Sequence, residues 1–104
     1  MKILIFSVAP WCQTGYGRTT RYLMHGLGRH FEVDLLVYFG LAGGNLSIGP
    51  HTIYPLTRIV DQATPDIRRY FDKAEADVVL QHFDTWILEP QWIEKTKLPV
   101  VTYA

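Results

Sequence analysis

The feature that most constrains this chain is a glycine-containing turn between a short apolar run and a helical pattern. The apolar run covers residues 3–6, and the turn, residues 8–18, contains Gly15 and Gly17. In α/β proteins such a turn binds phosphate, because backbone N–H groups converge at a helix N-terminus that carries partial positive charge. Glycine also lets the backbone come close to a ligand. The turn predicts an α/β fold and leaves open whether it binds an anion or merely connects two elements.

Apolar runs and helical patterns alternate along the chain. The expected strands cover residues 2–7, 32–39, 52–54, 77–81 and 99–103, with a loop over 40–50. The expected helices cover residues 18–29, 65–75 and, as a short segment, 90–95. This alternation predicts βαβ units and a Rossmann-like open parallel sheet of about five strands. In the doubly wound order 3-2-1-4-5, the glycine turn and the end of the fourth strand share one crevice.

Both longer helices carry a stripe of residues at helical spacing that is suited to packing on a sheet. The first stripe consists of Tyr16, Thr20, Leu23, Met24 and Leu27. The second consists of Ile67, Tyr70, Phe71 and Ala74. Parallel strands are normally covered on both faces, and two convincing helices are too few for about five strands. We therefore expect either a longer protein or a partner chain that covers a bare sheet face.

Composition limits the classes of function. The 104 residues suffice for one small domain, and we expect residues 1–104 to form a single one. The chain is 48% hydrophobic and 19% charged, which predicts a folded rather than a disordered protein. The zero net charge gives no electrostatic case for nucleic acid. Residues 1–60 carry a balance of +3 and residues 61–104 one of −3, so the glycine turn lies in the positive half.

Cysteine use and hydropathy indicate a cytoplasmic protein. Cys12 is the only cysteine, so no internal disulfide can form, which fits a reducing compartment. The apolar start is explained better by a buried parallel strand than by a signal peptide. No stretch is long enough to cross a membrane. The histidines lack ligand spacing with any Cys, Asp or Glu, so we expect no metal site.

The segment from Gly15 to Thr20 reads G-x-G-x-x-T and fits a dinucleotide fingerprint poorly. The third glycine is missing, about eight residues separate the strand core from Gly15, and the second strand ends without the acid that holds a ribose. No Gly-Lys-Ser/Thr follows, which excludes a Walker loop, and the G-x-S-x-G elbow of hydrolases is absent. A nicotinamide or flavin protein is therefore the least favoured class, and we expect no cofactor.

A second group of polar residues follows the expected fourth strand. His82 comes at the carboxyl end of that strand, where open α/β sheets bind ligands, and histidine can donate a hydrogen bond or carry a proton. Asp84 either orients His82, binds a sugar hydroxyl or is simply solvated. Trp86 offers an aromatic face either to a sugar ring or to packing. Arg18 opposes the helix dipole in the first helical turn, a cost that a nearby anion would offset.

Taken together, these residues resemble the N-terminal part of a GT-B glycosyltransferase of the family 4 type. The likeness covers the whole chain and depends on the order and spacing of its pieces. The pieces are the opening strand, Ala9-Pro10-Trp11, Thr14-Gly15-Tyr16-Gly17, Thr20-Arg21, Phe31-Glu32-Val33, the strand ending at His82, and Leu98-Pro99-Val100-Val101.

The resemblance implies two Rossmann-like domains that face each other across a cleft. The N-terminal domain mainly binds the acceptor, and the C-terminal domain binds a nucleotide-sugar. Gly15 and Gly17 would approach the donor's phosphates and the acceptor, and His82 matches a histidine near the transferred sugar. Transfer typically retains the anomeric configuration and needs no metal held by an Asp-x-Asp motif. The donor domain and the end of the N-terminal domain are absent from these residues, which should therefore lack transferase activity alone.

The resemblance completes the set of expected site residues and partners. The expected catalytic residue is His82, and the expected substrate-binding residues are Thr14, Gly15, Tyr16, Gly17, Arg18, Asp84 and Trp86. The implied partners are a nucleotide-sugar donor and a sugar or lipid acceptor, with peripheral contact to a membrane as one option. The alternative is a non-catalytic Rossmann-like binding module that needs a partner chain.

Overall fold

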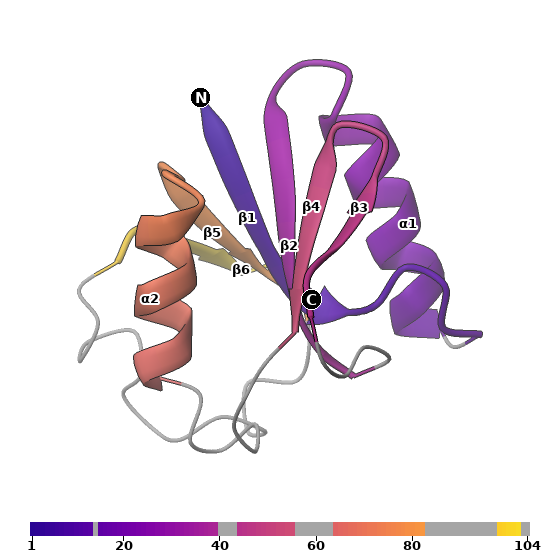
Figure 1. Ribbon diagram of the computed structural model, residues 1–104. Helices are drawn as coiled ribbons and strands as arrows, with labels where there is room; N and C mark the ends of the chain where they lie inside the picture. Colours follow the sequence, from indigo (N-terminus) through magenta and orange to yellow (C-terminus); the bar gives the residue numbers. More distant parts are fainter. Residues whose placement is uncertain (14, 40–43, 56–63, 83–97, 103–104) are drawn as a thin grey trace.

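The computed structural model describes residues 1–13, 15–39, 44–55, 64–82 and 98–102 (Figure 1). The elements are β1 (Lys2–Val8), α1 (Gly15–Leu27), β2 (Glu32–Phe39), β3 (Leu46–Ile48), β4 (His51–Pro55), α2 (Thr64–Lys73), β5 (Val78–Gln81) and β6 (Val100–Thr102). The strands form one sheet in the order β3-β4-β2-β1-β5-β6, and only the β3–β4 pair is antiparallel. The described residues therefore form a small α/β structure, consistent with a Rossmann-like sheet.

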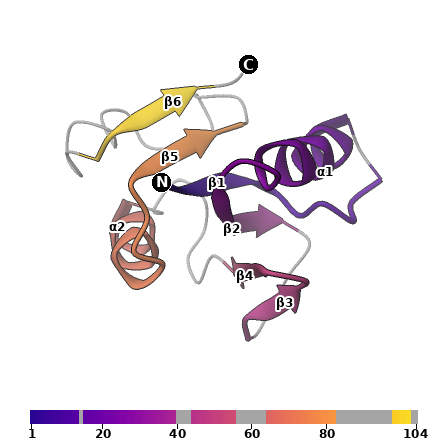
Figure 2. The same ribbon diagram turned by 90° about the horizontal axis from the view of Figure 1, so that it is seen from above.

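The order of the parallel strands confirms the doubly wound arrangement expected from the sequence. β1 is central and pairs with β2 on one side and with β5 on the other. The step from β1 to β2 and the step from β4 to β5 cross the sheet in opposite directions. Right-handed connections then place α1 and α2 on opposite faces, as Figure 2 shows. The carboxyl ends of β1 and β5 lie side by side at the switch point of the sheet.

The face covered by α1 holds one of two apolar clusters. Met24 of α1 is 2% exposed and packs with a buried set from the sheet. This set consists of Ile3, Ile5, Ala9, Val33, Leu35, Val37 and Ile53. Leu23 and Leu27 are half-buried against the cluster, and Thr20 is buried. The stripe expected for the first helix is confirmed for these four residues, whereas the side chain of Tyr16 lies outside the described residues.

The face covered by α2 holds the other cluster. Ile67, Tyr70 and Ala74 are buried, and Phe71 packs beside them, which confirms the stripe expected for the second helix. Their partners in the sheet are Leu4, Phe6, Leu36, Tyr54 and Val79. The rings of Tyr54 and Tyr70 lie 5.0 Å apart, within the range of favourable aromatic pairs. Full burial of each large apolar side chain stabilises the fold by about 1.5–3 kcal/mol.

The first helix covers Gly15–Leu27 rather than residues 18–29. Both glycines that we assigned to the turn lie instead in the first helical turn. At the other end, a Cβ on Gly28 would lie 2.7 Å from the carbonyl oxygen of Met24 and 3.0 Å from Cε1 of His51. The approach of His51, more than twenty residues away in sequence, is a contact that no local pattern predicts.

The expected loop over residues 40–50 contains an additional strand, so the sheet has six strands rather than about five. β3 pairs antiparallel with β4, and Ile48 faces His51 across a two-residue turn. Gly49 in that turn has a φ of 55°, a conformation that glycine adopts without steric cost. The Gly49-Pro50 dipeptide was the available signal for this hairpin. The expected short helix over residues 90–95 lies outside the described residues.

The second helix begins at Thr64 and ends at Lys73, two residues before the expected end. Glu75 has a φ of 55°, which is the left-handed conformation. The N–H of Ala76 donates to the carbonyl oxygen of Phe71 at 3.1 Å, the bond expected of a Schellman cap. Ala76 and Phe71 also pack against the same apolar cluster. The cap therefore ends the helix, although glycine normally occupies its left-handed position.

We expect Glu75→Gly to stabilise the protein by about 1 kcal/mol, because a side chain in the left-handed conformation costs about that much. The measurement is urea unfolding followed by circular dichroism. Glu75→Gln is the control and should leave stability unchanged, since it keeps the strained side chain. A stability gain from Glu75→Gln equal to that from Glu75→Gly would show that charge, rather than backbone strain, is responsible.

One strip of the sheet is left open on the α1 side. Val101 of β6 pairs with Leu80 of β5, so both side chains point to the same face. Leu80 and Val78 belong to the cluster on the α1 side and are half-buried, whereas Val101 is 55% exposed. Among the described residues, α1 covers β1 and β2 but leaves Val101 open. This strip agrees with the expectation that two helices leave part of the sheet uncovered.

Candidate functional site

His82 lies directly after β5, at the carboxyl edge of the sheet. Its N–H donates to the carbonyl oxygen of Phe6 at 3.0 Å, which extends the pairing with β1 by one residue. Side chains alternate along a strand, and Leu80 belongs to the cluster on the α1 side. His82 therefore falls on the α1 side. Its side chain is 5% exposed, so the imidazole is held in a low-dielectric setting at the switch point.

Two buried hydroxyl groups lie at the same edge and on the same face. Ser7 belongs to the last part of β1 and Thr20 to α1, and both are fully buried. The hydroxyl of Thr20 donates to Oγ of Ser7 at 3.1 Å. This bond ties α1 to the sheet behind the glycine turn. Sequence reasoning missed Ser7 and did not pair it with Thr20, which it placed in a packing stripe and in the G-x-G-x-x-T segment. The available signal was a serine that ends an apolar run.

The structure gives the two glycines of the turn different environments. A Cβ on Gly17 would clash with the carbonyl oxygen of Cys12 and would lie 3.0 Å from the Cβ of Cys12. Gly17 is therefore required for the first turn of α1 to pack on the preceding loop. A Cβ on Gly15 would meet no atom within 4 Å, and Gly15 is exposed. Only Gly15 offers open space for a ligand at the helix N-terminus.

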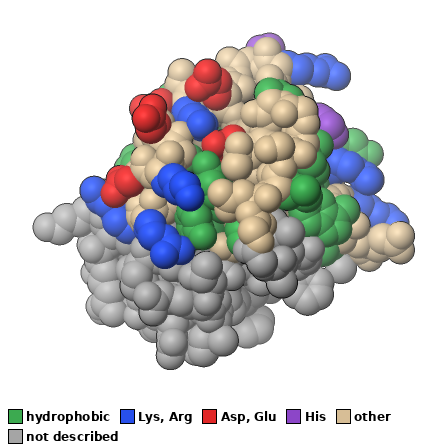
Figure 3. Space-filling view, in the orientation of Figure 1, with side chains coloured by type: hydrophobic (Ala, Val, Ile, Leu, Met, Phe, Trp, Pro, Cys, Tyr) green, Lys and Arg blue, Asp and Glu red, His purple; other side chains and the backbone are tan. Residues whose placement is uncertain are grey.

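Arg18 is exposed in the first turn of α1, which contains no acidic residue. In Figure 3, Lys and Arg side chains appear on both the α1 side and the α2 side, whereas the Asp and Glu side chains in view lie away from α1. The hydroxyl of Thr19 donates to the carbonyl oxygen of Gly15 at 3.0 Å and so stiffens this turn. The helix N-terminus and Arg18 together give this edge a positive potential that suits an anion.

The structure therefore brings Gly15, Gly17, Arg18 and His82 to the carboxyl edge of the sheet, around β1 and β5. Thr14, Asp84, Trp86 and the side chain of Tyr16 lie outside the described residues. A further polar group at this edge is Gln81, which is fully buried. Neither polar atom of its side-chain amide has a hydrogen-bond partner among the described residues. A buried amide without partners costs about 1–3 kcal/mol, so this edge carries unused hydrogen-bonding capacity.

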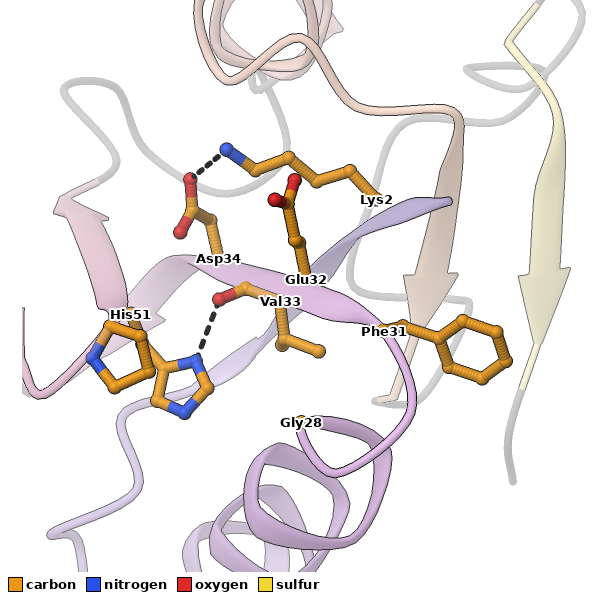
Figure 4. A pocket seen from close by; sticks show the side chains of 8 residues that line it. Lys2, Gly28, Phe31, Glu32, Val33, Asp34 and His51 are labelled. Atoms are coloured by element: carbon orange, nitrogen blue, oxygen red, sulfur yellow. Dashed lines mark hydrogen bonds and ion pairs between the residues drawn. The ribbon is translucent and has the colours of Figure 1, made fainter.

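A hollow lies at the opposite, amino edge of the sheet (Figure 4). It has a volume of about 310 Å³ and is lined by Lys2, Gly28, Phe31, Glu32, Val33, Asp34, Pro50 and His51. Nζ of Lys2 lies 2.9 Å from Oδ2 of Asp34, and the N–H of Thr52 donates to Oδ1 of Asp34 at 2.9 Å. Nδ1 of His51 lies 2.8 Å from the carbonyl oxygen of Val33. These groups satisfy one another, which indicates a structural role.

Two groups at this ion pair have raised pKa values, Lys2 itself and the nearby Tyr54. Burial lowers the pKa of Lys2, but the hydrogen bond and the charge of Asp34 outweigh it, and the net pKa is raised. Burial raises the pKa of the Tyr54 phenol, and the charge of Asp34 adds to that rise. Open α/β sheets bind ligands at their carboxyl edge. The amino-edge pocket is therefore a weaker candidate for a ligand site than the carboxyl edge.

We expect the stability of the fold to decline above about pH 10, because Lys2 and Tyr54 both titrate there when unfolded. A raised folded pKa means that each group contributes fully below its unfolded pKa and that this contribution is lost as the pH rises. Lys2→Met should make the decline shallower, as measured by urea unfolding between pH 8 and 11. Asp34→Asn keeps the hydrogen bond from the N–H of Thr52 and should also make the decline in stability shallower. A decline in Lys2→Met as steep as in the parent would contradict the ion pair's role.

Comparison with known proteins identifies no family. No family model matches the chain, and no curated protein matches it. Among the described residues, no helix is long and apolar enough to cross a membrane. The same residues hold no group of His, Cys, Asp or Glu side chains arranged to bind a metal ion. The fold and the carboxyl edge therefore define an α/β protein with a candidate anion site at a sheet switch point.

Proposed function

We propose that this chain is the acceptor-side part of a retaining GT-B glycosyltransferase, which moves a sugar from a nucleotide-sugar to an acceptor. The single observation that carries the proposal is the burial of His82 at the switch point, next to β1 and on the same face as α1. A buried imidazole at the carboxyl edge of a parallel sheet is poised to contact a ligand bound across that edge. The order of motifs in the sequence adds the resemblance to the family 4 type.

The residues of the carboxyl edge take distinct roles in this proposal. Gly15 leaves room for the donor's phosphates to approach the N-terminus of α1, where backbone N–H groups and Arg18 favour negative charge. His82 donates a hydrogen bond to the transferred sugar and helps to hold it in place. In the reaction the bond between the anomeric carbon and the donor phosphate breaks, a bond to the acceptor oxygen forms, and the departing nucleotide phosphate takes up the acceptor's proton.

The first test asks whether the polypeptide continues into a donor-binding domain and whether the longer protein transfers sugar. We expect the coding DNA downstream of Ala104 to encode a second domain with paired glutamates. The longer protein should release nucleotide from a nucleotide-sugar in the presence of acceptor, whereas residues 1–104 alone should show no turnover. Turnover by the 104-residue chain, or a stop codon directly after Ala104, would contradict the proposal.

A non-catalytic binding module that pairs with another chain is the second candidate. The exposed strip around Val101 favours it, because an uncovered apolar sheet face calls for a covering element. The two candidates differ in the behaviour of the isolated chain. A cooperative unfolding transition supports the binding module, whereas aggregation without a cooperative transition supports an enzyme deprived of its remaining parts.

A further inference from the structure

A groove beside α1 shares no lining residue with the carboxyl-edge site or with the amino-edge pocket. Its volume is about 200 Å³, and it is lined by Pro10, Trp11, Arg21, Met24, His25 and Ile48. We call this set the α1 groove. It joins the loop after β1, one side of α1 and the strand β3, and it shares no residue with Gly15, Arg18 or His82. Nothing proposed above for the carboxyl edge depends on it.

The floor of the α1 groove is apolar and one wall is aromatic. Met24 is 2% exposed, Pro10 is buried, and Ile48 is half-buried against the same cluster. Trp11 is 40% exposed and presents its indole to the groove. An apolar cavity of about 150 Å³ accepts a benzene ring, so the α1 groove has room for one six-membered ring and a small substituent. The lining therefore favours a ligand that carries a single flat apolar ring.

Two basic residues also line the groove. Arg21 and His25 lie four residues apart on α1, hence on one side of the helix, and both are exposed. Among the described residues that line the groove, none is acidic. The whole segment from Met1 to Phe31 contains four Lys and Arg residues and no Asp or Glu. No acid of this segment thus competes for the guanidinium of Arg21, whose planar donors match a carboxylate or a phosphate.

We propose that the α1 groove binds a small aryl anion, that is, a carboxylate or phosphate group carried on a single flat ring. The ring packs between Trp11 and the floor formed by Met24 and Ile48. The anionic group accepts hydrogen bonds from Arg21 and from the imidazole of His25. Recognition needs both parts, because the floor alone would accept any small apolar molecule and the two polar side chains alone would accept any anion.

The test is a titration of the isotope-labelled protein with phenyl phosphate, followed by NMR. We expect saturable shifts at the Trp11 indole and at the backbone amides of Arg21 and His25. Phenol lacks the charge and inorganic phosphate lacks the ring, and each should bind at least tenfold more weakly than phenyl phosphate. Benzoate in a parallel titration distinguishes a carboxylate ligand from a phosphate ligand, and saturation by either one supports the proposal.

Two matched variants separate the groove from the general positive field of this face. Arg21→Gln should weaken binding of phenyl phosphate at least tenfold. Arg29→Gln removes the same charge outside the groove and should change the affinity less than twofold. Both residues are exposed, so the fold should persist, which the dispersion of amide signals verifies.

Three results would overturn the proposal. Equal weakening by Arg21→Gln and Arg29→Gln would assign binding to the diffuse field rather than to the groove. Shifts confined to Gly15 and His82 would move the anion to the carboxyl edge. Binding to vesicles of anionic lipid without binding of phenyl phosphate or benzoate would make this face a membrane-contact surface instead.

Discussion

Replacing Gly17 by alanine is expected to destabilise the protein by about 3 kcal/mol, whereas the same change at Gly15 should stabilise it by about 0.5 kcal/mol. The added methyl group at Gly17 runs into the carbonyl oxygen of Cys12. The Cys12 backbone is itself held, because its N–H donates to the carbonyl oxygen of Ala9 at 3.1 Å. At Gly15 the methyl group enters open space, and alanine has the better helix propensity.

Urea unfolding of the two alanine variants measures this difference directly. A loss of about 3 kcal/mol is a large share of the 5–15 kcal/mol by which domains are stable. Gly17→Ala should therefore unfold at a clearly lower urea concentration than the parent. If Gly17→Ala is as stable as the parent, the first turn of α1 is able to slide away from Cys12. Because Gly15 tolerates a side chain structurally, Gly15→Val in the longer protein then reports on ligand approach alone. Unchanged donor affinity in that variant would make the turn a plain connection.

The second large effect is expected at His82. If the proposed transferase activity is present, His82→Ala should lower turnover about a hundredfold, the usual contribution of a positioned hydrogen-bonding or proton-carrying group. His82 is 5% exposed, so removing its ring also costs stability. His82→Gln fills more of the space and retains one hydrogen-bond donor, and it should recover part of the turnover. The measurements are kcat and the melting temperature of each variant.

His51 provides the matched control for this experiment. It is also buried, with 8% exposure, and it hydrogen-bonds to Val33 at the amino edge of the sheet. His51→Gln should lower the melting temperature to a similar extent and leave turnover intact at temperatures where the protein is folded. Full turnover in His82→Ala would remove His82 from the site. Loss of turnover in both variants would trace the effect to folding instead.

Much of the fold was predictable because its signals are local. The expected strand over residues 32–39 coincides with β2, since a long apolar run between polar residues reports burial on both faces. The stripe from Ile67 to Ala74 marks the buried side of α2. The right-handed preference of connections between parallel strands then limits the strand order, because each connection leaves few positions in the sheet for the next strand. The meeting of the glycine turn and His82 at one sheet edge follows from that order.

What the sequence by itself determined is the alternation of elements, the faces that they bury and the edge at which the polar residues converge. Only the tertiary structure decided which glycine is needed for packing, where α2 ends and that β3 joins the sheet. It alone also paired Thr20 with Ser7 and brought Trp11, Arg21 and His25 to one groove. The physical reason is that periodicity reports the environment of one segment. A steric contact or a pocket depends on which distant segments meet, and at what distance.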